Sequence, residues 1–271
     1  MSGSEYHLGS DAAELNRLAR QGAALAPATR MLLQAAGIGP GMRVLDLGCG
    51  AGDVSFAVAE LVGPTGSVLG IDRSPEAVVS AKARAKAAGL DAVTFVEGDI
   101  HQPAPDGPFD AIVGRLVLMY VPDPAAVLAT QATQLRPGGL VAPIEFDMRI
   151  AGSLPAVPLV TQLLSWIGET FQRANIAPAL GTQLWSVLRK AGLTPRGMIG
   201  VQPHFGSDDA NGSALLAGIV KSLLPVIERT GVAKAEDIAI ETLASRLSAD
   251  FAAADAVFVH PALLTAWATK G

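Results

Sequence analysis

Residues 44–52 read Val44-Leu45-Asp46-Leu47-Gly48-Cys49-Gly50-Ala51-Gly52. A short apolar run with one acid precedes glycines at alternate positions and then a helical pattern, which predicts a buried strand, a tight turn and a helix start. Glycine adopts backbone angles closed to other residues and lets a ligand approach the main chain. The first helical turn offers N–H groups to a carboxylate or phosphate. The stretch therefore predicts a ligand-binding turn, and a purely structural turn is the alternative.

The glycine spacing separates two kinds of nucleotide-binding turn. Dinucleotide-binding dehydrogenases use G-x-G-x-x-G, whereas residues 46–52 follow D-x-G-x-G-x-G. An NAD-dependent dehydrogenase is therefore the less favoured interpretation.

Composition narrows the class of protein. The 271 residues are half hydrophobic with a net charge of −5, enough for one elaborated domain or two small ones. Mild acidity without a basic cluster argues against nucleic acid as a partner. Cys49 is the single cysteine, which excludes an internal disulfide and fits a reducing compartment. No apolar run has the length of a membrane span and the first residues are polar, so we expect a cytoplasmic protein.

Strands and helices alternate through the first half of the chain. We expect strands at 43–47, 67–71, 93–97, 109–113 and 140–146, separated by short connections and helices. This alternation predicts a parallel sheet covered on both faces. Asp46, Asp72 and Asp99 fall at or just beyond the ends of three successive strands, where ligands of such sheets bind; the alternative is that they are solvated loop charges. Pro143 interrupts the fifth strand and predicts a bulge or an unpaired partner group.

Beyond residue 147 the alternation stops and helical patterns dominate. We expect five regions: N-terminal helices or a flap at 1–38, the binding core at 39–147, a helical segment and the end of the core at 148–205, a helical lid insertion at 206–254, and the final strand of the core at 255–271. The apolar helices fit a lid over a hydrophobic small molecule, and simple helix packing or a homodimer interface fits them equally.

Five stretches in this order resemble the motifs of class I S-adenosylmethionine (SAM)-dependent methyltransferases. They are residues 46–52, Gly70-Ile71-Asp72, Gly98-Asp99-Ile100, residues 109–113 and Leu135-Arg136-Pro137-Gly138-Gly139. The chain is most similar to the small-molecule group that includes ubiquinone/menaquinone methyltransferases (methyltransferase type 11/25). The resemblance implies an α/β fold with a seven-stranded Rossmann-like sheet, its last strand antiparallel, and helical lid additions.

The resemblance also implies the cofactor, SAM, with S-adenosyl-L-homocysteine (SAH) as product. In the family the three glycines lie against the methionine part, and an acid at Asp46 helps to hold its amino group. The acid at Asp72 accepts the ribose hydroxyls. Asp99 takes the adenine amino group and Ile100 covers the ring. Three other residues are expected to contact the cofactor. The stem of Arg73 would cover adenine where the family often has an apolar residue. Arg115 would lie near the methionine end, with a surface charge as an equal alternative, and Tyr6 would lie in a flap, with a loose tail as the alternative.

The expected reaction is methyl transfer to a small, fairly hydrophobic molecule by O- or C-methylation, with a secondary metabolite or a quinone-like acceptor as examples. Positioning supplies much of the acceleration, and an oxygen acceptor needs a base to take its proton. Glu145, His204 and Tyr120 are the candidate catalytic residues. The alternative is a SAM-binding protein that uses the cofactor for non-methylating chemistry or regulation. No Cys or His cluster has metal-ligand spacing, so we expect no metal.

Overall fold

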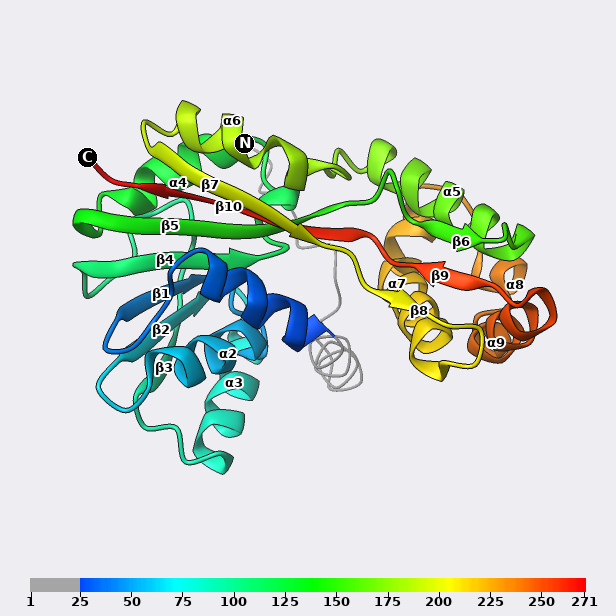
Figure 1. The fold of residues 1–271 in the computed structure, drawn as a ribbon, viewed down its shortest axis with the longest axis horizontal. Helices are drawn as coiled ribbons and strands as arrows, with labels where there is room; N and C mark the ends of the chain where they lie inside the picture. Colours follow the sequence, from blue (N-terminus) through cyan, green and yellow to red (C-terminus); the bar gives the residue numbers. More distant parts are fainter. Residues whose placement is uncertain (1–24) are drawn as a thin grey trace. The chain divides into compact units, whose positions relative to one another are not determined.

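A seven-stranded sheet with the order β3-β2-β1-β4-β5-β10-β7 carries the glycine turn (Figure 1). Parallel pairing joins β1 to β2 and β4, β2 to β3, and β4 to β5, whereas β10 runs antiparallel to β7. Lys270, directly after β10, exchanges backbone hydrogen bonds with Gly138 and Gly139 near the start of β5, so the last strand also opposes β5. The predicted fold class is confirmed. The strands are β1 (Arg43–Leu47), β2 (Ser67–Asp72), β3 (Val93–Glu97), β4 (Phe109–Arg115), β5 (Leu135–Asp147), β7 (Thr194–Val201) and β10 (Ala262–Thr269).

The computed structural model describes residues 25–271. They form two units. The larger unit holds the described chain up to Phe146, together with Leu180–Val201 and Leu263–Gly271. The smaller unit holds Asp147–Ala179 and Gln202–Ala262. Tyr6 and the first 24 residues of the region expected to form N-terminal helices or a flap lie outside the described residues.

Two helices of the larger unit begin at side-chain caps that the sequence provides. Ser74 accepts a hydrogen bond from the N–H of Ala77 ahead of Pro75, and Asp123 accepts one from Ala126 ahead of Pro124. Helices α2 and α3 contact strands β1–β3, and α6 contacts β7 and α4. The helices are α2 (Asp53–Val62), α3 (Pro75–Ala87), α4 (Pro124–Ala132), α6 (Leu180–Lys190), the 3-10 turn η1 (Leu118–Tyr120) and a helical stretch at 25–35.

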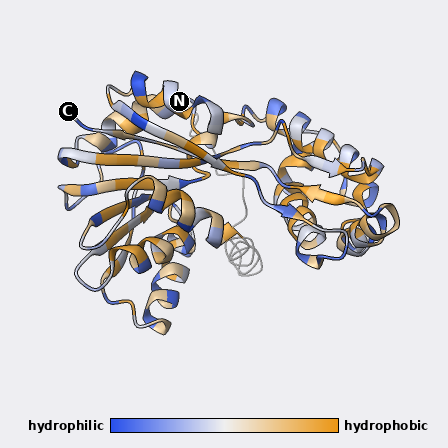
Figure 2. Ribbon diagram, in the orientation of Figure 1, coloured by the Kyte–Doolittle hydropathy of each residue, from blue (hydrophilic) through white to orange (hydrophobic). Residues whose placement is uncertain are grey.

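Apolar residues recur along the central strands, as the hydropathy colouring of the ribbon in Figure 2 shows. Val44, Leu45, Ile71 and Ile112 are at most 1% exposed, which is expected for parallel strands covered on both faces. The core of the larger unit therefore lies directly beneath the strand ends that bear the candidate site.

The smaller unit combines a three-stranded antiparallel sheet, β6-β9-β8, with helices. Helices α5, α7 and α9 contact one another, β6 contacts α5, and β8 contacts α7. The elements are β6 (Gly152–Leu154), β8 (His204–Phe205), β9 (Val257–Val259), α5 (Pro158–Arg173), α7 (Ala210–Arg229), α8 (Ala235–Ile238), η2 (Ile240–Thr242) and α9 (Leu243–Ala254).

Two expectations about strands differ from the structure. Residues 255–271 are not one strand of the core, because β9 belongs to the small sheet and only β10 to the large one. Pro261 separates them, and proline has no N–H for a sheet ladder. At Pro143 the register continues from Ala142 through Pro143 to Ile144 without a shift, so the bulge is absent, and the other expected alternative, an unpaired partner group, stays a prediction.

Helix α7 is the one helix within residues 25–271 that is long and apolar enough to cross a membrane, judged by length and composition alone. More than half of its most apolar segment is buried inside the structure, and core helices of soluble proteins pass the same test. The expectation of no membrane span stays a prediction.

Candidate cofactor site

Four charged residues lie at or just beyond the carboxyl ends of adjacent strands of the large sheet. Asp46 lies on β1, Asp72 ends β2, Asp99 follows β3 and Arg115 ends β4. The chain order along the sheet reverses between β1 and β4, and ligands of such sheets bind at this switch point. The fold thus brings the predicted residues to one edge of the sheet.

The glycine turn is held in a conformation that other residues rarely adopt. Gly48, Gly50 and Gly52 have φ values of +62°, +52° and +94°. A Cβ on Gly48 would lie 2.5 Å from Cγ2 of Val117, whereas a Cβ on Gly50 would meet nothing within 4 Å. The turn is therefore packed against the chain at Gly48 and open at Gly50, where a ligand has access to the backbone. Helix α2 begins after Gly52 without a side-chain cap.

Asp46 is a buried carboxylate with one oxygen satisfied. Its Oδ2 accepts a hydrogen bond of 2.6 Å from the hydroxyl of Ser55. Its Oδ1 is buried and has no hydrogen-bond partner among the described residues. Burial raises the pKa of Asp46 to about 7, against the lowering effects of Ser55 and Arg115. An unpaired buried oxygen is costly, so this atom is suited to a cationic or hydrogen-bonding group of a ligand.

Asp72 ties the glycine turn to the end of β2. Its Oδ2 accepts from the N–H of Gly50 at 2.9 Å and its Oδ1 accepts from the N–H of Ser74 at 2.9 Å. Each carboxylate oxygen has a second lone pair. The side chain can therefore fix the turn and still accept hydroxyl groups.

The loop after β3 presents Asp99 and Ile100. Exposed Asp99 accepts from the backbone N–H of His101 at 2.9 Å and contacts its ring Nδ1 at 2.7 Å. The backbone bond from His101 is the main cause of the lowered pKa of Asp99, with the ring of His101 and the charge of Arg73 adding to it. Arg73 itself is exposed and Ile100 is buried.

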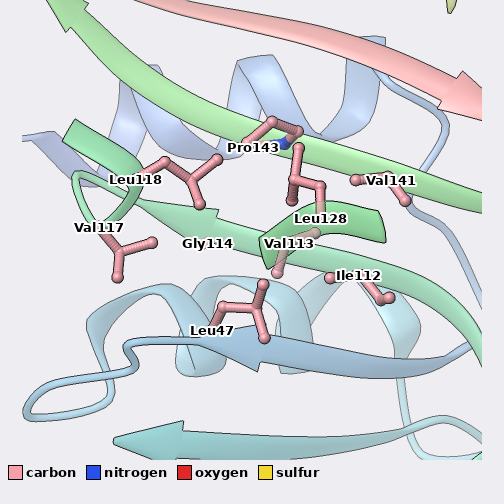
Figure 3. Close-up of a pocket in the computed structure, with 9 residues that line it drawn as sticks. All are labelled: Leu47, Ile112, Val113, Gly114, Val117, Leu118, Leu128, Val141 and Pro143. Atoms are coloured by element: carbon pink, nitrogen blue, oxygen red, sulfur yellow. The ribbon is translucent and has the colours of Figure 1, made fainter. Parts of the chain in front are cut away.

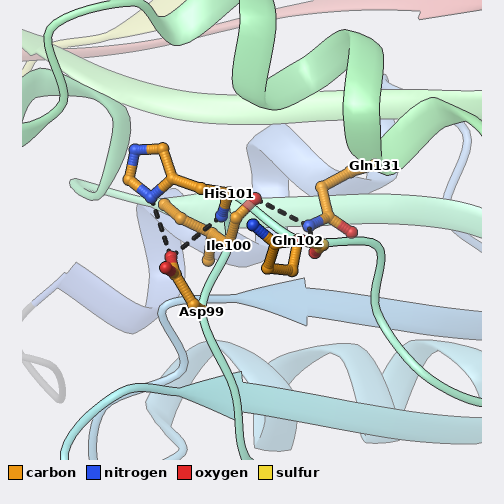
Figure 4. A network of polar contacts seen from close by, with 5 residues as sticks. All are labelled: Asp99, Ile100, His101, Gln102 and Gln131. Atoms are coloured by element: carbon orange, nitrogen blue, oxygen red, sulfur yellow. Dashed lines mark hydrogen bonds and ion pairs between the residues drawn. The ribbon is translucent and has the colours of Figure 1, made fainter.

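Gln131 of α4 lies beside this loop and is hydrogen-bonded to it, as Figure 4 shows. Its amide nitrogen donates to the carbonyl oxygens of Ile100 at 2.7 Å and Gln102 at 2.6 Å, and its amide oxygen accepts from the N–H of Ala104 at 3.2 Å. The side chain is completely buried. One residue thus satisfies three backbone groups of a loop that lies beyond the end of its strand.

Arg115 brings a cation to the same edge. Its Nη1 donates to Oγ1 of Thr29 at 2.7 Å. Burial lowers the pKa of Arg115, while the charges of Asp53 and Asp46 act in the opposite direction. A guanidinium therefore lies within electrostatic reach of the Asp46 carboxylate.

The three candidate catalytic residues have different surroundings. Glu145 on β5 is completely buried, and its Oε1 accepts from the N–H groups of Val117 at 3.1 Å and Leu118 at 2.7 Å. Burial raises the pKa of Glu145 to about 8. Tyr120 is half-buried at the end of η1. His204 is exposed in the smaller unit, with its Nδ1 2.9 Å from the carbonyl oxygen of Gln202. Their catalytic roles stay predictions.

A small cavity lies between β4, β5 and the turn that Glu145 holds (Figure 3). It has no room for a water molecule. Its lining is entirely apolar: Leu47, Ile112, Val113, Gly114, Val117, Leu118, Leu128, Val141 and Pro143. With no polar group to orient a ligand, we interpret it as a packing defect of the core.

A family sequence model described as methyltransferase domain matches residues 38–180, which is more than half of the chain. The chain belongs to this methyltransferase family. This membership confirms the family prediction and SAM as its cofactor.

Three similar proteins illustrate the relationship. The chain is 43% identical over 98 residues to nocamycin O-methyltransferase of Saccharothrix syringae, covering 36% of this chain and 35% of the relative. It is 35% identical over 138 residues to demethylmenaquinone methyltransferase of Lactococcus lactis, covering 51% and 50%. A solved SAM-dependent methyltransferase from Aquifex aeolicus superposes with a TM-score of 0.50 at 22% identity, covering 63% of this chain and 82% of the other, and shows a shared fold. The chain spans half or less of these two curated relatives.

The residues at the methyltransferase site fit the cofactor. The unpartnered Oδ1 of Asp46 suits an ammonium group, and the space at Gly50 admits a ligand to the backbone. Asp72 keeps lone pairs for hydroxyl groups. The individual roles of these side chains remain proposals.

Three residues of the site, Ser55, Gln131 and Thr29, were not predicted from the sequence. Each is a buried polar residue on the core-facing side of a helix, beside apolar residues such as Val54, Leu128 and Leu32. A polar residue at a core-facing position of a predicted helix is the sequence signal that could have identified them, because a buried polar side chain requires a specific partner.

Proposed function

We propose that this protein methylates a small, fairly hydrophobic molecule on oxygen or carbon, with SAM as the methyl donor. The observation that carries the proposal is the buried, unpartnered Oδ1 of Asp46 beside a glycine turn that is open at Gly50. A buried carboxylate oxygen without a partner is costly, and a bound ammonium group would compensate it.

The proposed roles follow the chemistry of each side chain. Asp46 and Arg115 bind the ammonium and carboxylate groups of the methionine part, since one is anionic and the other cationic. Asp72 accepts the ribose hydroxyls. Asp99 accepts the adenine amino group, and Ile100 covers the ring. When bound, SAM supplies a methyl group on a positively charged sulfur, which is a strong electrophile.

The contacts of Glu145 favour a positioning role over proton transfer. Its Oε1 accepts from two backbone N–H groups of the turn that contains Val117. Val117 in turn packs against Gly48. We therefore propose that Glu145 holds the turn after β4 against the glycine turn. Tyr120 and His204 remain the candidates for a group that assists the acceptor.

The class of acceptor rests on two supports. The two curated relatives are named after nocamycin and demethylmenaquinone, both small organic molecules. The helices of the smaller unit, in the region predicted to form a lid, are rich in apolar residues. A homodimer and a cytoplasmic location stay predictions.

A methyl-transfer assay tests the proposal. Purified protein is incubated with SAM carrying a deuterated methyl group and a panel of quinols and phenols. We expect SAH to form only when an acceptor is present, and the acceptor to gain one labelled methyl group. An Asp46→Ala variant serves as the control and should lose this activity. Failure of calorimetry to detect SAH binding, or an acceptor altered without gaining the label, would contradict the proposal.

A further inference from the structure

Thr29 lies in the helical stretch 25–35, ahead of the strands that form the site, and its side chain is 1% exposed. Its hydroxyl donates to the carbonyl oxygen of Leu25 at 2.8 Å and accepts from Nη1 of Arg115 at 2.7 Å. A hydroxyl has a single proton. Because that proton is directed to Leu25, the oxygen presents its lone pairs to the guanidinium.

Arg115 gains a fixed position from this contact. A free arginine side chain samples many rotamers, and a buried hydroxyl acceptor restricts it. The charges of Asp46 and Asp53 both act on this guanidinium. Asp53 is already paired with Arg84 at 2.8 Å.

Asp46 and Arg115 together offer opposite charges to an amino-acid group. Asp46 presents an unpartnered oxygen, and the guanidinium has five N–H donors of which Thr29 takes one. A zwitterionic group is recognised only if both charges lie at the correct separation. The position of the guanidinium therefore decides how well the carboxylate of such a group is bound.

We infer that Thr29 is a positioning residue that acts through Arg115 on the carboxylate of the cofactor's methionine part. The inference rests on the proposed function, because it assumes that this edge of the sheet binds SAM. It also makes the helical stretch 25–35 a functional part of the cofactor site.

The test compares two ligands that differ at the methionine end. SAH carries the amino-acid carboxylate, whereas 5′-methylthioadenosine lacks it. The Thr29→Val change keeps the shape and removes the hydroxyl. We expect the Kd for SAH to rise about tenfold, because the change removes a single hydrogen bond to a charged group. The Kd for 5′-methylthioadenosine should stay within about twofold of the wild type.

Three further variants make the result specific. Thr29→Ser keeps the hydroxyl and should restore SAH binding. Thr265→Val removes another buried hydroxyl, on β10 of the same unit, and should leave both ligands unaffected. In an Arg115→Gln background, Thr29→Val should have no additional effect, because the two residues act as one unit.

Two results would overturn the inference while leaving the proposed function intact. One is an unchanged Kd for SAH in Thr29→Val. The other is an equal loss for both ligands, which would indicate a purely structural role. Absence of SAH binding in the wild type would instead overturn the proposed function and this inference with it.

Discussion

Asp46 combines a stability cost with a ligand-binding role. Its carboxylate is 1% exposed, and only Oδ2 has a hydrogen-bond partner within residues 25–271. Burial favours the neutral acid, which is why its pKa is raised to about 7. A cationic ligand group would favour the carboxylate instead. Binding of an ammonium group and loss of the Asp46 proton are therefore coupled.

This coupling predicts the pH dependence of SAH binding. Below pH 7 the free protein carries protonated Asp46, so binding must release its proton and is weakened; above pH 7 the carboxylate is already formed. The Kd for SAH should fall about tenfold between pH 6 and pH 8, measured by calorimetry. In Asp46→Asn this change should disappear. A wild-type Kd that rises with pH would contradict the assignment of Asp46.

Two glycines of the same turn should respond differently to alanine. Gly48→Ala places a Cβ 2.5 Å from Val117, and we expect the free energy of unfolding to fall by about 2 kcal/mol. A Cβ at Gly50 would have no atom within 4 Å, so Gly50→Ala should lower the free energy of unfolding by only about 1 kcal/mol, through backbone strain. It should nevertheless weaken SAH binding. Urea unfolding and calorimetry measure the two effects. Gly138→Ala, with a φ of +73° and open space, is the matched control for strain. Equal SAH binding by the Gly50 and Gly138 variants would contradict the assignment.

At the scale of elements, two buried side chains organise the loops after adjacent strands. Gln131 of α4 satisfies three backbone groups of residues 100–104. Glu145 of β5 accepts two N–H groups of the turn after β4. The first residues of the two loops, Gly98 and Leu116, still donate to the strand residues Asp72 and Ile144, but the groups beyond them lie past the ends of the strands. Side chains from neighbouring elements therefore determine the shape of both loops.

The Gln131 network predicts a loss at the adenine end of the ligand. Gln131→Met keeps the length of the side chain and removes all three hydrogen bonds, so the loop loses its fixed shape. We expect the Kd for SAH and that for 5′-methylthioadenosine to rise together, each about tenfold. Gln134→Met, at a partly exposed position just after the same helix, is the control. Wild-type affinity in the Gln131 variant would show that the loop is stable without the network.

At the scale of the whole molecule, the chain leaves the large sheet after Phe146, returns for α6 and β7, and leaves again until β10. The candidate cofactor residues from Asp46 to Arg115 all belong to the larger unit, as does Glu145. His204 belongs to the smaller unit. Each unit has its own sheet and its own packed helices.

The sequence alone determined the local features. Alternating strands and helices, caps such as Ser74, and the glycine spacing of residues 46–52 depend on neighbours within a few positions, so they predicted the sheet, the binding turn and the family. Other features became visible only in three dimensions. Gln131 binds the loop after β3, and Thr29 accepts a hydrogen bond from Arg115. Glu145 binds the turn after β4, and β9 belongs to the small sheet. These features join residues far apart in the chain, and their partners are set by packing, which no local pattern records.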